Sequence, residues 1–231
     1  MGMSSAVRAR GTLVVVVGAL LTAGILALPA AADDPAPVVN FSVRDVLPGA
    51  PVAISGTLVN GAADAGRQVQ LYERRAPFPG TWAVLQQSTA GADGSYSFSV
   101  VPVLKAYYSV VAPATAAAGR EASPGLLVTV HRRVSIKVSD RTPRKNQLVR
   151  FSGFISPIYP LGPGAVATLQ RRDKTGAFTN LKPALLKAAG NFTSYRVRMH
   201  VKTPGVYRIA VPSSTYYGGG ASDAVVVRVH R

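Results

Sequence analysis

The chain has 231 residues, of which 48% are hydrophobic and 16% charged, and it carries a formal net charge of +16. It contains no cysteine, which excludes disulfide bonds, thiolate metal sites and cysteine nucleophiles. This apolar content is sufficient for two domains of about 100 residues, each stabilised by packing alone.

The first 32 residues have the pattern of a secretory signal peptide. Arg8 and Arg10 precede an apolar run over residues 12–28, and three alanines at 30–32 form a small-residue cleavage site. We expect export, cleavage after Ala32 and no membrane span in the mature protein. An uncleaved anchor is the alternative, because the apolar run is at the lower limit of spanning length.

The remaining chain reads as two copies of one unit, residues 33–132 and 133–231. Six segments recur in the same order, 96 to 99 residues apart. They are Ile54-Ser55-Gly56 with Phe151-Ser152-Gly153, 70–74 with 168–172, Gly80-Thr81-Trp82 with Gly176-Ala177-Phe178, 93–96 with 189–192, 108–110 with 207–209, and 128–132 with 227–231. This alignment makes Phe192 the equivalent of Tyr96.

Seven short segments of each copy have the composition of β-strands, rich in Val, Tyr and Phe and bounded by Gly, Pro, Asn or Asp. In the first copy they are 38–43, 52–59, 68–73, 82–87, 95–101, 107–112 and 126–130. No segment has the periodicity of an amphipathic helix. Seven strands in about 100 residues predict an all-β fold of two tandem Greek-key β-sandwiches. Only Arg132-Arg133 separates the copies, so we expect a fixed angle between them.

The order of motifs in each copy is Ser-Gly, Leu-x-Arg-Arg, Gly-x-Trp or Phe, Gly-x-Tyr or Phe, and Gly-x-Tyr-x-Ile-x-Val. Over nearly all of residues 38–231 this order resembles the bacterial immunoglobulin-like or fibronectin III-like repeats of secreted actinobacterial proteins. The resemblance implies an immunoglobulin-like fold and a secreted, cell-wall-associated location more strongly than it implies an activity. Because the cysteine pair of antibody domains is absent, Trp82 and Phe178 are expected to carry the packing instead.

Charge differs strongly between the copies. Residues 33–131 contain six basic and seven acidic residues, whereas residues 132–231 contain eighteen basic and three acidic residues. The second copy should therefore attract an anionic polymer of the cell envelope, and nucleic acid only non-specifically. The candidate polyanion-binding residues are Arg141, Arg144, Lys145, Arg196, Arg198 and Lys202. Ordinary solvation of an outward strand face is the alternative.

Three tyrosines, Tyr159, Tyr216 and Tyr217, lie on loops that should meet at one pole of the second copy. Tyrosines on such loops offer flat apolar area with a hydroxyl group, which suits sugar or peptide recognition. The alternative is that they anchor these loops against the end of the sandwich.

Motifs for catalysis are absent from the sequence, and we expect neither an enzyme nor a cofactor. The histidines are His131, His200 and His230; the first and last are equivalent positions one domain apart, so no shared metal site is expected. Two function classes remain. One is a non-catalytic binding or adhesion module of the cell envelope; the other is a structural spacer, or a subunit that pairs with another secreted protein through an edge strand.

Overall fold

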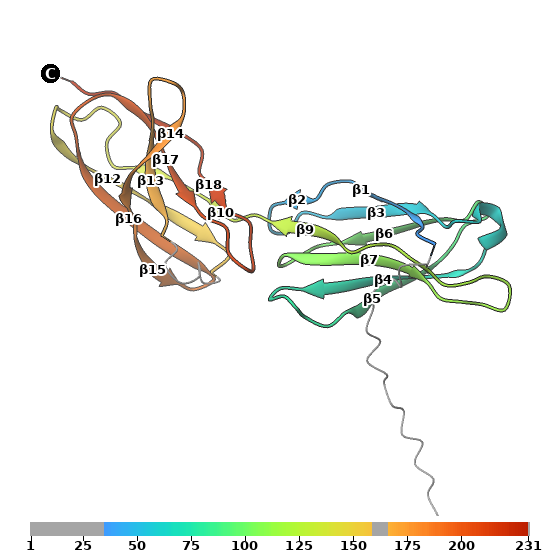
Figure 1. The fold of residues 1–231 in the computed structure, drawn as a ribbon. Helices are drawn as coiled ribbons and strands as arrows, with labels where there is room; N and C mark the ends of the chain where they lie inside the picture. Colours follow the sequence, from blue (N-terminus) through green and yellow to red (C-terminus); the bar gives the residue numbers. More distant parts are fainter. Residues whose placement is uncertain (1–34, 159–165, 231) are drawn as a thin grey trace, which may run out of the picture.

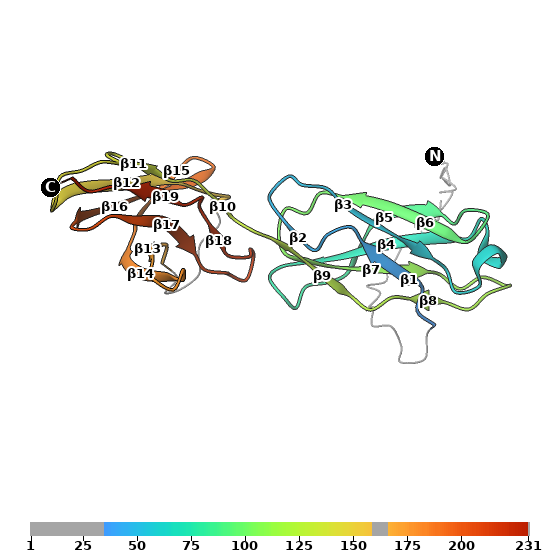
Figure 2. The ribbon, with the colours of Figure 1, turned by 90° about the horizontal axis from the view of Figure 1, so that it is seen from above.

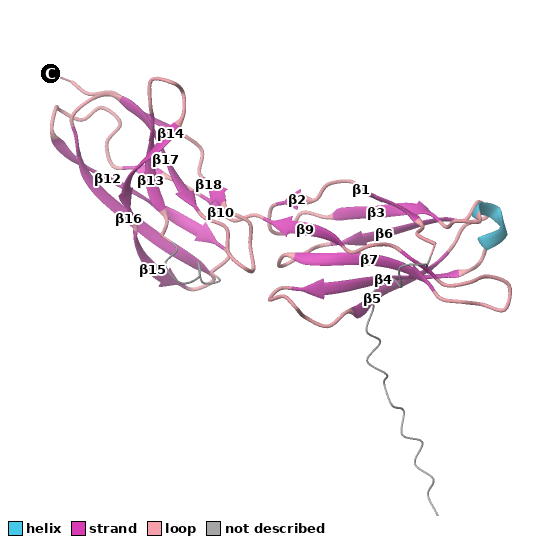
Figure 3. Cartoon of the chain, viewed as in Figure 1, coloured by secondary structure: helices cyan, strands magenta, loops and turns pink. Residues whose placement is uncertain are grey.

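A computed structural model describes residues 35–158 and 166–230. The described residues form β-strands and one short 3-10 turn, Gly61–Asp64, and they contain no α-helix (Figure 3). The prediction of an all-β fold is confirmed. The predicted signal peptide, residues 1–32, lies outside the described residues.

The first half, residues 35–132, contains two sheets (Figure 1). Its strands are β1 (Val38–Phe41), β2 (Asp45–Val46), β3 (Val52–Thr57), β4 (Gln68–Arg75), β5 (Ala83–Thr89), β6 (Ser95–Val100), β7 (Ala106–Ala112), β8 (Glu121–Ala122) and β9 (Leu126–Val130). One sheet has the order β1-β3-β6; the other has the order β2-β9-β7-β4-β5, with β8 also paired to β7. All seven predicted strands are present, and β2 and β8 are short additions.

The second half, residues 133–230, contains two further sheets, seen as two layers in Figure 2. Its strands are β10 (Arg133–Val134), β11 (Lys137–Val138), β12 (Gln147–Ser156), β13 (Thr168–Arg172), β14 (Phe178–Pro183), β15 (Leu185–Ala189), β16 (Phe192–Val201), β17 (Gly205–Val211), β18 (Gly220–Ala221) and β19 (Val225–Val227). The orders are β10-β12-β16-β15, with β11 beside β12, and β14-β13-β17-β18, with β19 beside β17. The chain changes sheet at Ala184, and this change creates the edge strand β15, which was not predicted.

Each half has its own hydrophobic core, built from side chains that alternate along the strands. The core aromatic residues are Tyr96, Phe98 and Tyr108 in the first half, and Phe151, Tyr195 and Tyr207 in the second.

The prediction that Trp82 and Phe178 carry this packing is wrong. Trp82 packs on the outer side of its sheet with Tyr72, and Phe178 lies under Arg208, whose guanidinium carbon is 3.9 Å from the ring centroid. Both aromatics face the outward residues of the neighbouring strand, because Arg74 and Arg172, which stack on them, alternate with the inward positions.

One glycine and one tyrosine form the same contact in both halves. The hydroxyl of Tyr96 donates to the carbonyl of Val38 across Gly56, at 2.6 Å. The hydroxyl of Tyr195 donates to the carbonyl of Ser135 across Gly153, also at 2.6 Å. A Cβ at either glycine would collide with that carbonyl. Tyr195, not Phe192, is therefore the equivalent of Tyr96; the predicted alignment is wrong by three residues because β16 has ten residues and β6 only six.

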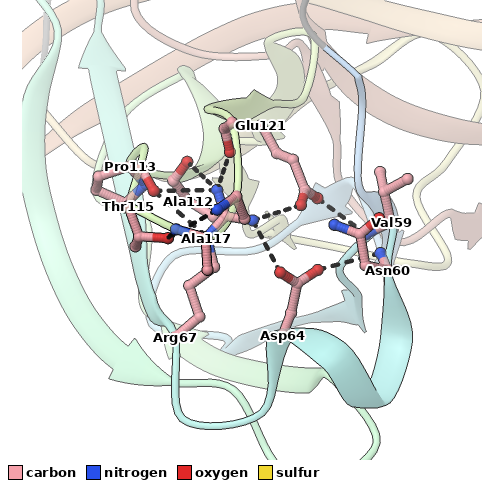
Figure 4. A network of polar contacts seen from close by, with 11 residues as sticks. Val59, Asn60, Asp64, Arg67, Ala112, Pro113, Thr115, Ala117 and Glu121 are labelled. Carbon is pink, nitrogen blue, oxygen red and sulfur yellow. Dashed lines mark hydrogen bonds and ion pairs between the residues drawn. The ribbon is translucent and has the colours of Figure 1, made fainter.

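A buried network of charged side chains closes the free pole of the first half (Figure 4). Arg67 Nη1 lies 3.0 Å from Asp64 Oδ1 and 2.6 Å from Glu121 Oε1, and these three side chains are at most 4% exposed. The rest of the guanidinium donates to the carbonyls of Ala112, Pro113 and Gly119, and the second oxygen of each carboxylate accepts a backbone N–H, from Val59 or Asn60. Burial raises the pKa of Asp64, but the hydrogen bonds from Arg67 and Asn60 outweigh it, so the net effect is a lowered pKa.

The corresponding pole of the second half is covered by the first half instead. Tyr217, in the loop between β17 and β18, is 3% exposed and belongs to the hydrophobic core of the first half. Lys105 donates its backbone N–H to the carbonyl of Tyr216 and its Nζ to that of Ser214, both at 2.8 Å. Arg132, which is 2% exposed, lies over the Tyr217 ring at 5.2 Å. The two halves are thus joined by direct contacts beyond the connecting chain.

Candidate anion-binding face

The strongest concentration of charge on a sheet is the outward side of β11, β12 and β16. Val149, Phe151 and Val197 point into the core, so the alternate residues Arg150, Arg196 and Arg198 point outward and are exposed. Arg150 lies opposite Arg198, and Ser152 lies between Arg196 and Lys137 on the two neighbouring strands. We define the basic face as Lys137, Arg150, Lys187, Arg196 and Arg198 of this sheet, together with Lys182, which lies on β14 of the other sheet and donates its Nζ to the carbonyl of Arg198 at 2.9 Å.

The positive charges of the basic face are not neutralised by neighbouring carboxylates. All six side chains are exposed, and none of them forms a salt bridge within residues 35–158 and 166–230. The acidic residues of this half are used elsewhere: Asp140 and Asp173 accept hydrogen bonds from their own turns, and Asp223 lies in the loop before β19. Successive outward residues are about 7 Å apart along a strand and about 5 Å apart across strands, so the positive charges are close enough to act together.

A shallow hollow of about 600 Å³ lies within the basic face. It forms because Ser152 and Ser194 are small, whereas their outward neighbours Arg150, Arg196 and Phe154 are long. Its other side is β15, which contributes Leu185 and Lys187. A polyanion laid along β16 would therefore meet cations on three strands.

The structure separates the predicted binding residues into two groups. Arg196 and Arg198 lie at the centre of the basic face. Arg141, Arg144 and Lys145 lie on the turn before β12, where Lys145 donates its N–H to the carbonyl of His230 at 3.0 Å. This turn adjoins Lys202, because Asn146 donates its N–H to Val201 at the end of β16 at 2.8 Å. The first group belongs to the sheet, and the second lies at its end.

Four cations of the basic face, Lys137, Arg150, Lys182 and Lys187, were not predicted as binding residues. The outward direction of Arg150 could have been predicted from the sequence, because Arg150 stands between the apolar residues Val149 and Phe151, which point inward. Lys187 needed knowledge of β15, which has no counterpart in the first half to align with.

The predicted tyrosine site is not assembled as an exposed ligand site. Tyr217 is buried at the junction and Tyr216 packs against the core of the first half, so both anchor their loop. Tyr159 lies outside the described residues. The physical reason is that the loop carrying Tyr216 and Tyr217 faces the first half rather than solvent.

The histidines occupy three separate places. His131 lies at the junction, with Nε2 2.9 Å from Asp45 Oδ1 and Nδ1 2.7 Å from the carbonyl of Gly219. His200 lies on β16 with Nδ1 2.8 Å from the carbonyl of Asn146, and His230 pairs with the turn before β12. In the described ranges, no group of three or more metal-ligating side chains comes together. Over the same residues, no helix has the length and apolar character needed to cross a membrane.

No protein-family model matches the chain, and no curated protein matches it significantly in sequence.

Proposed function

We propose that the chain is a secreted, non-catalytic protein of the bacterial cell envelope, composed of two tandem immunoglobulin-like β-sandwiches. In this proposal the second half binds an anionic polymer of the cell surface through the basic face. One observation supports this proposal above all. Four cations lie side by side on one sheet without a carboxylate among them, namely Lys137, Arg150, Arg196 and Arg198.

We choose this face because most of its cations have no protein partner among the described residues and can contact a ligand. On the opposite sheet of the same half, Arg172 and Arg208 stack on Phe178, and Arg208 also donates to Gln170 at 2.8 Å. Those guanidinium groups already have protein partners. Apart from Lys182, whose Nζ donates to the carbonyl of Arg198, the cations of the basic face point to solvent, which is where a bound polymer would lie.

The test is binding of the whole protein to immobilised teichoic acid at increasing salt concentration. A polyanion that contacts Z cations gives a logarithmic affinity that falls linearly with the logarithm of salt concentration, with a slope of roughly −0.7 to −0.9 per contact. We expect a steep slope for the wild type and a shallow one after Arg150→Gln, Arg196→Gln and Arg198→Gln. Salt-independent binding, or equal binding by this variant, would reject the proposal.

The second candidate function is a structural spacer that holds partners at a fixed separation. It is favoured by the junction, where Tyr217 and Lys105 join the halves without a flexible linker. A spacer predicts no retention on the anionic polymer at any salt concentration, so the same experiment distinguishes the two functions.

A further inference from the structure

The hollow in the basic face combines cations with exposed apolar side chains. Phe154 is 48% exposed and Leu185 is 79% exposed, and both line the hollow together with Lys137, Arg150, Lys187 and Arg196. Single exposed apolar residues are common on protein surfaces. Here they share one concave site with four cations, which is a more specific arrangement.

The apolar side of the hollow is held in place by the fold. The Phe154 ring stacks edge-on against Phe192, with centroids 4.5 Å apart and an interplanar angle of 71°. Leu185 lies on the edge strand β15 opposite Arg196, so it points to the same side as that arginine. A ligand that enters the hollow therefore meets Phe154 on β12 and Leu185 on β15, with Arg196 on the strand between them.

The equivalent hollow of the first half supplies a natural comparison. It is lined by Val38, Asn40, Ser55, Thr57, Ser95 and Ser97. Val38 is 58% exposed, but Ser97 and Thr57 stand at the positions of Arg196 and Phe154, and the hollow has no cation. The second half has thus replaced neutral, small residues by cations and by an apolar group at the same site. Cations alone would serve a hydrophilic polymer; the added Phe154 and Leu185 point to a ligand that also has an apolar part.

We propose that this hollow binds a phosphate ester that carries an aliphatic chain, namely the lipid-linked end of the anionic polymer. The inference rests on the proposed function and names the part of the polymer that the site recognises. The phosphate lies between Arg150 and Arg196, and the first methylene groups lie against Phe154 and Leu185. The charged remainder of the polymer follows Arg198, His200 and Lys202 along β16, a path of about 20 Å from Arg196.

A concave site favours a single chain over the surface of a bilayer. Membrane-surface binding needs apolar side chains that project beyond the rest of the protein. Phe154 and Leu185 instead line a hollow between long basic side chains. This geometry suits one aliphatic chain that leaves its surroundings and enters the protein.

The experiment uses the whole protein and two soluble probes, monomeric dodecyl phosphate and glycerol phosphate, in titration calorimetry. We expect dodecyl phosphate to bind at least tenfold more tightly. The double variant Phe154→Thr and Leu185→Ser, which introduces the first-half residue Thr57 at the position of Phe154, should abolish that difference. The matched control is Leu148→Ser, since Leu148 is 51% exposed on β12 but outside the hollow, and it should leave both affinities unchanged.

The outcomes separate this inference from the proposed function. If the two probes bind equally, or if the double variant keeps the preference, the inference is wrong even when salt-dependent teichoic acid binding persists. If teichoic acid binding is also absent, the proposed function fails as well. Binding of anionic vesicles that depends on Phe154 and Leu185, without binding of monomeric dodecyl phosphate, would assign the site to a bilayer surface and overturn the inference.

Discussion

The two halves place apolar side chains at equivalent inward positions and share one contact between a tyrosine and a strand carbonyl, but they differ on one outward face. Strands β1, β3 and β6 present Asn40, Ala53, Ser97 and Ser99, whereas β11, β12 and β16 present Lys137, Arg150, Arg196 and Arg198 at the equivalent register positions. The core and the contact between tyrosine and strand carbonyl are retained in both. The difference indicates that the fold depends on the inward positions, which leaves the outward positions free to acquire a binding function.

The two halves also close the same pole in different ways. The register pairs Ala112 with Glu121 in the first half and Val211 with Gly220 in the second. Glu121 completes the buried charge network at the free end, whereas Gly220 lies at the junction, where an added Cβ would collide with the carbonyl of Arg132. The free pole is closed by the buried charge network, and the covered pole is closed by contacts with the other half.

The largest expected effect comes from breaking the network that only the first half has. Glu121→Ala leaves the buried guanidinium of Arg67 without one of its carboxylates, which typically costs about 3–5 kcal/mol. We expect urea denaturation to show this loss and hydrogen exchange to place it in β7 and β8. The control is Asp223→Ala, an exposed acidic residue of the second half, which should change stability by less than about 0.5 kcal/mol; an equal loss there would show that the buried network is not the cause.

Removing the tyrosine that crosses the junction should have the next largest effect. Tyr217→Ala deletes a buried aromatic ring, for which about 3 kcal/mol is typical. Because the ring belongs to the core of the first half, hydrogen exchange should accelerate in β7 and β9 of that half, although the substitution lies in the second. Acceleration confined to β17 and β18 would show that the ring stabilises only its own half.

Exchanging the outward residues between the halves should move the binding function with them. Arg150→Ala, Arg196→Ser and Arg198→Ser place first-half residues on the second half, and at about 1 kcal/mol per charge near an anionic surface the affinity for teichoic acid should fall about 100-fold. Adding Ala53→Arg, Ser97→Arg and Ser99→Arg should restore part of it. If the first exchange has no effect, the charges that matter lie elsewhere, and the turn with Arg144 and Lys145 is then the place to look.

Removing the tyrosine contact that both halves share should cause a smaller loss of stability, of similar size in each half. Tyr96→Phe and Tyr195→Phe each remove one hydrogen bond to a strand carbonyl, worth about 1 kcal/mol. Measured by urea denaturation, the two losses should agree within about 0.5 kcal/mol. A clear inequality would mean that the two contacts are not equivalent.

The smallest effect should be a pH dependence that arises from the buried carboxylate of Asp64. The pKa of Asp64 is lowered in the folded state, because the hydrogen bonds from Arg67 and Asn60 outweigh the effect of burial. A lowered folded pKa contributes stability above the ordinary carboxyl value of about 4, and this contribution is lost as the pH falls through the folded value. Urea denaturation across this range should show the loss, and Asp64→Asn should reduce the pH dependence.

The strands were predictable because alternation and turn residues are local properties. Tyr96, Phe98 and Val100 alternate with serines, and this pattern alone places β6 with its correct burial. The basic face was predicted only at Arg196 and Arg198. Alternation shows that Arg150 points outward, but only strand pairing places Arg150 and Lys137 beside the two predicted residues. Pairing brings together residues that are far apart in sequence, and no local pattern reports it.

The role of Tyr217 was beyond sequence reasoning for a related reason. A tyrosine on a glycine-rich loop has the same composition whether it faces a ligand or a neighbouring domain. Only the way one half sits on the other decides between these roles, and here the neighbouring domain occupies the pole.

The contribution of Tyr217 to the first half has a consequence for the order of events on the ribosome. The chain is synthesised from its amino terminus, so the strands up to Val130 are complete well before residue 217 is added. During that interval the first half lacks one aromatic side chain of its own core, and the end of the core that Tyr217 covers is open to water. Maturation of the first half therefore waits for the second, and a nascent chain that stops between the two is left with an unfilled apolar pole.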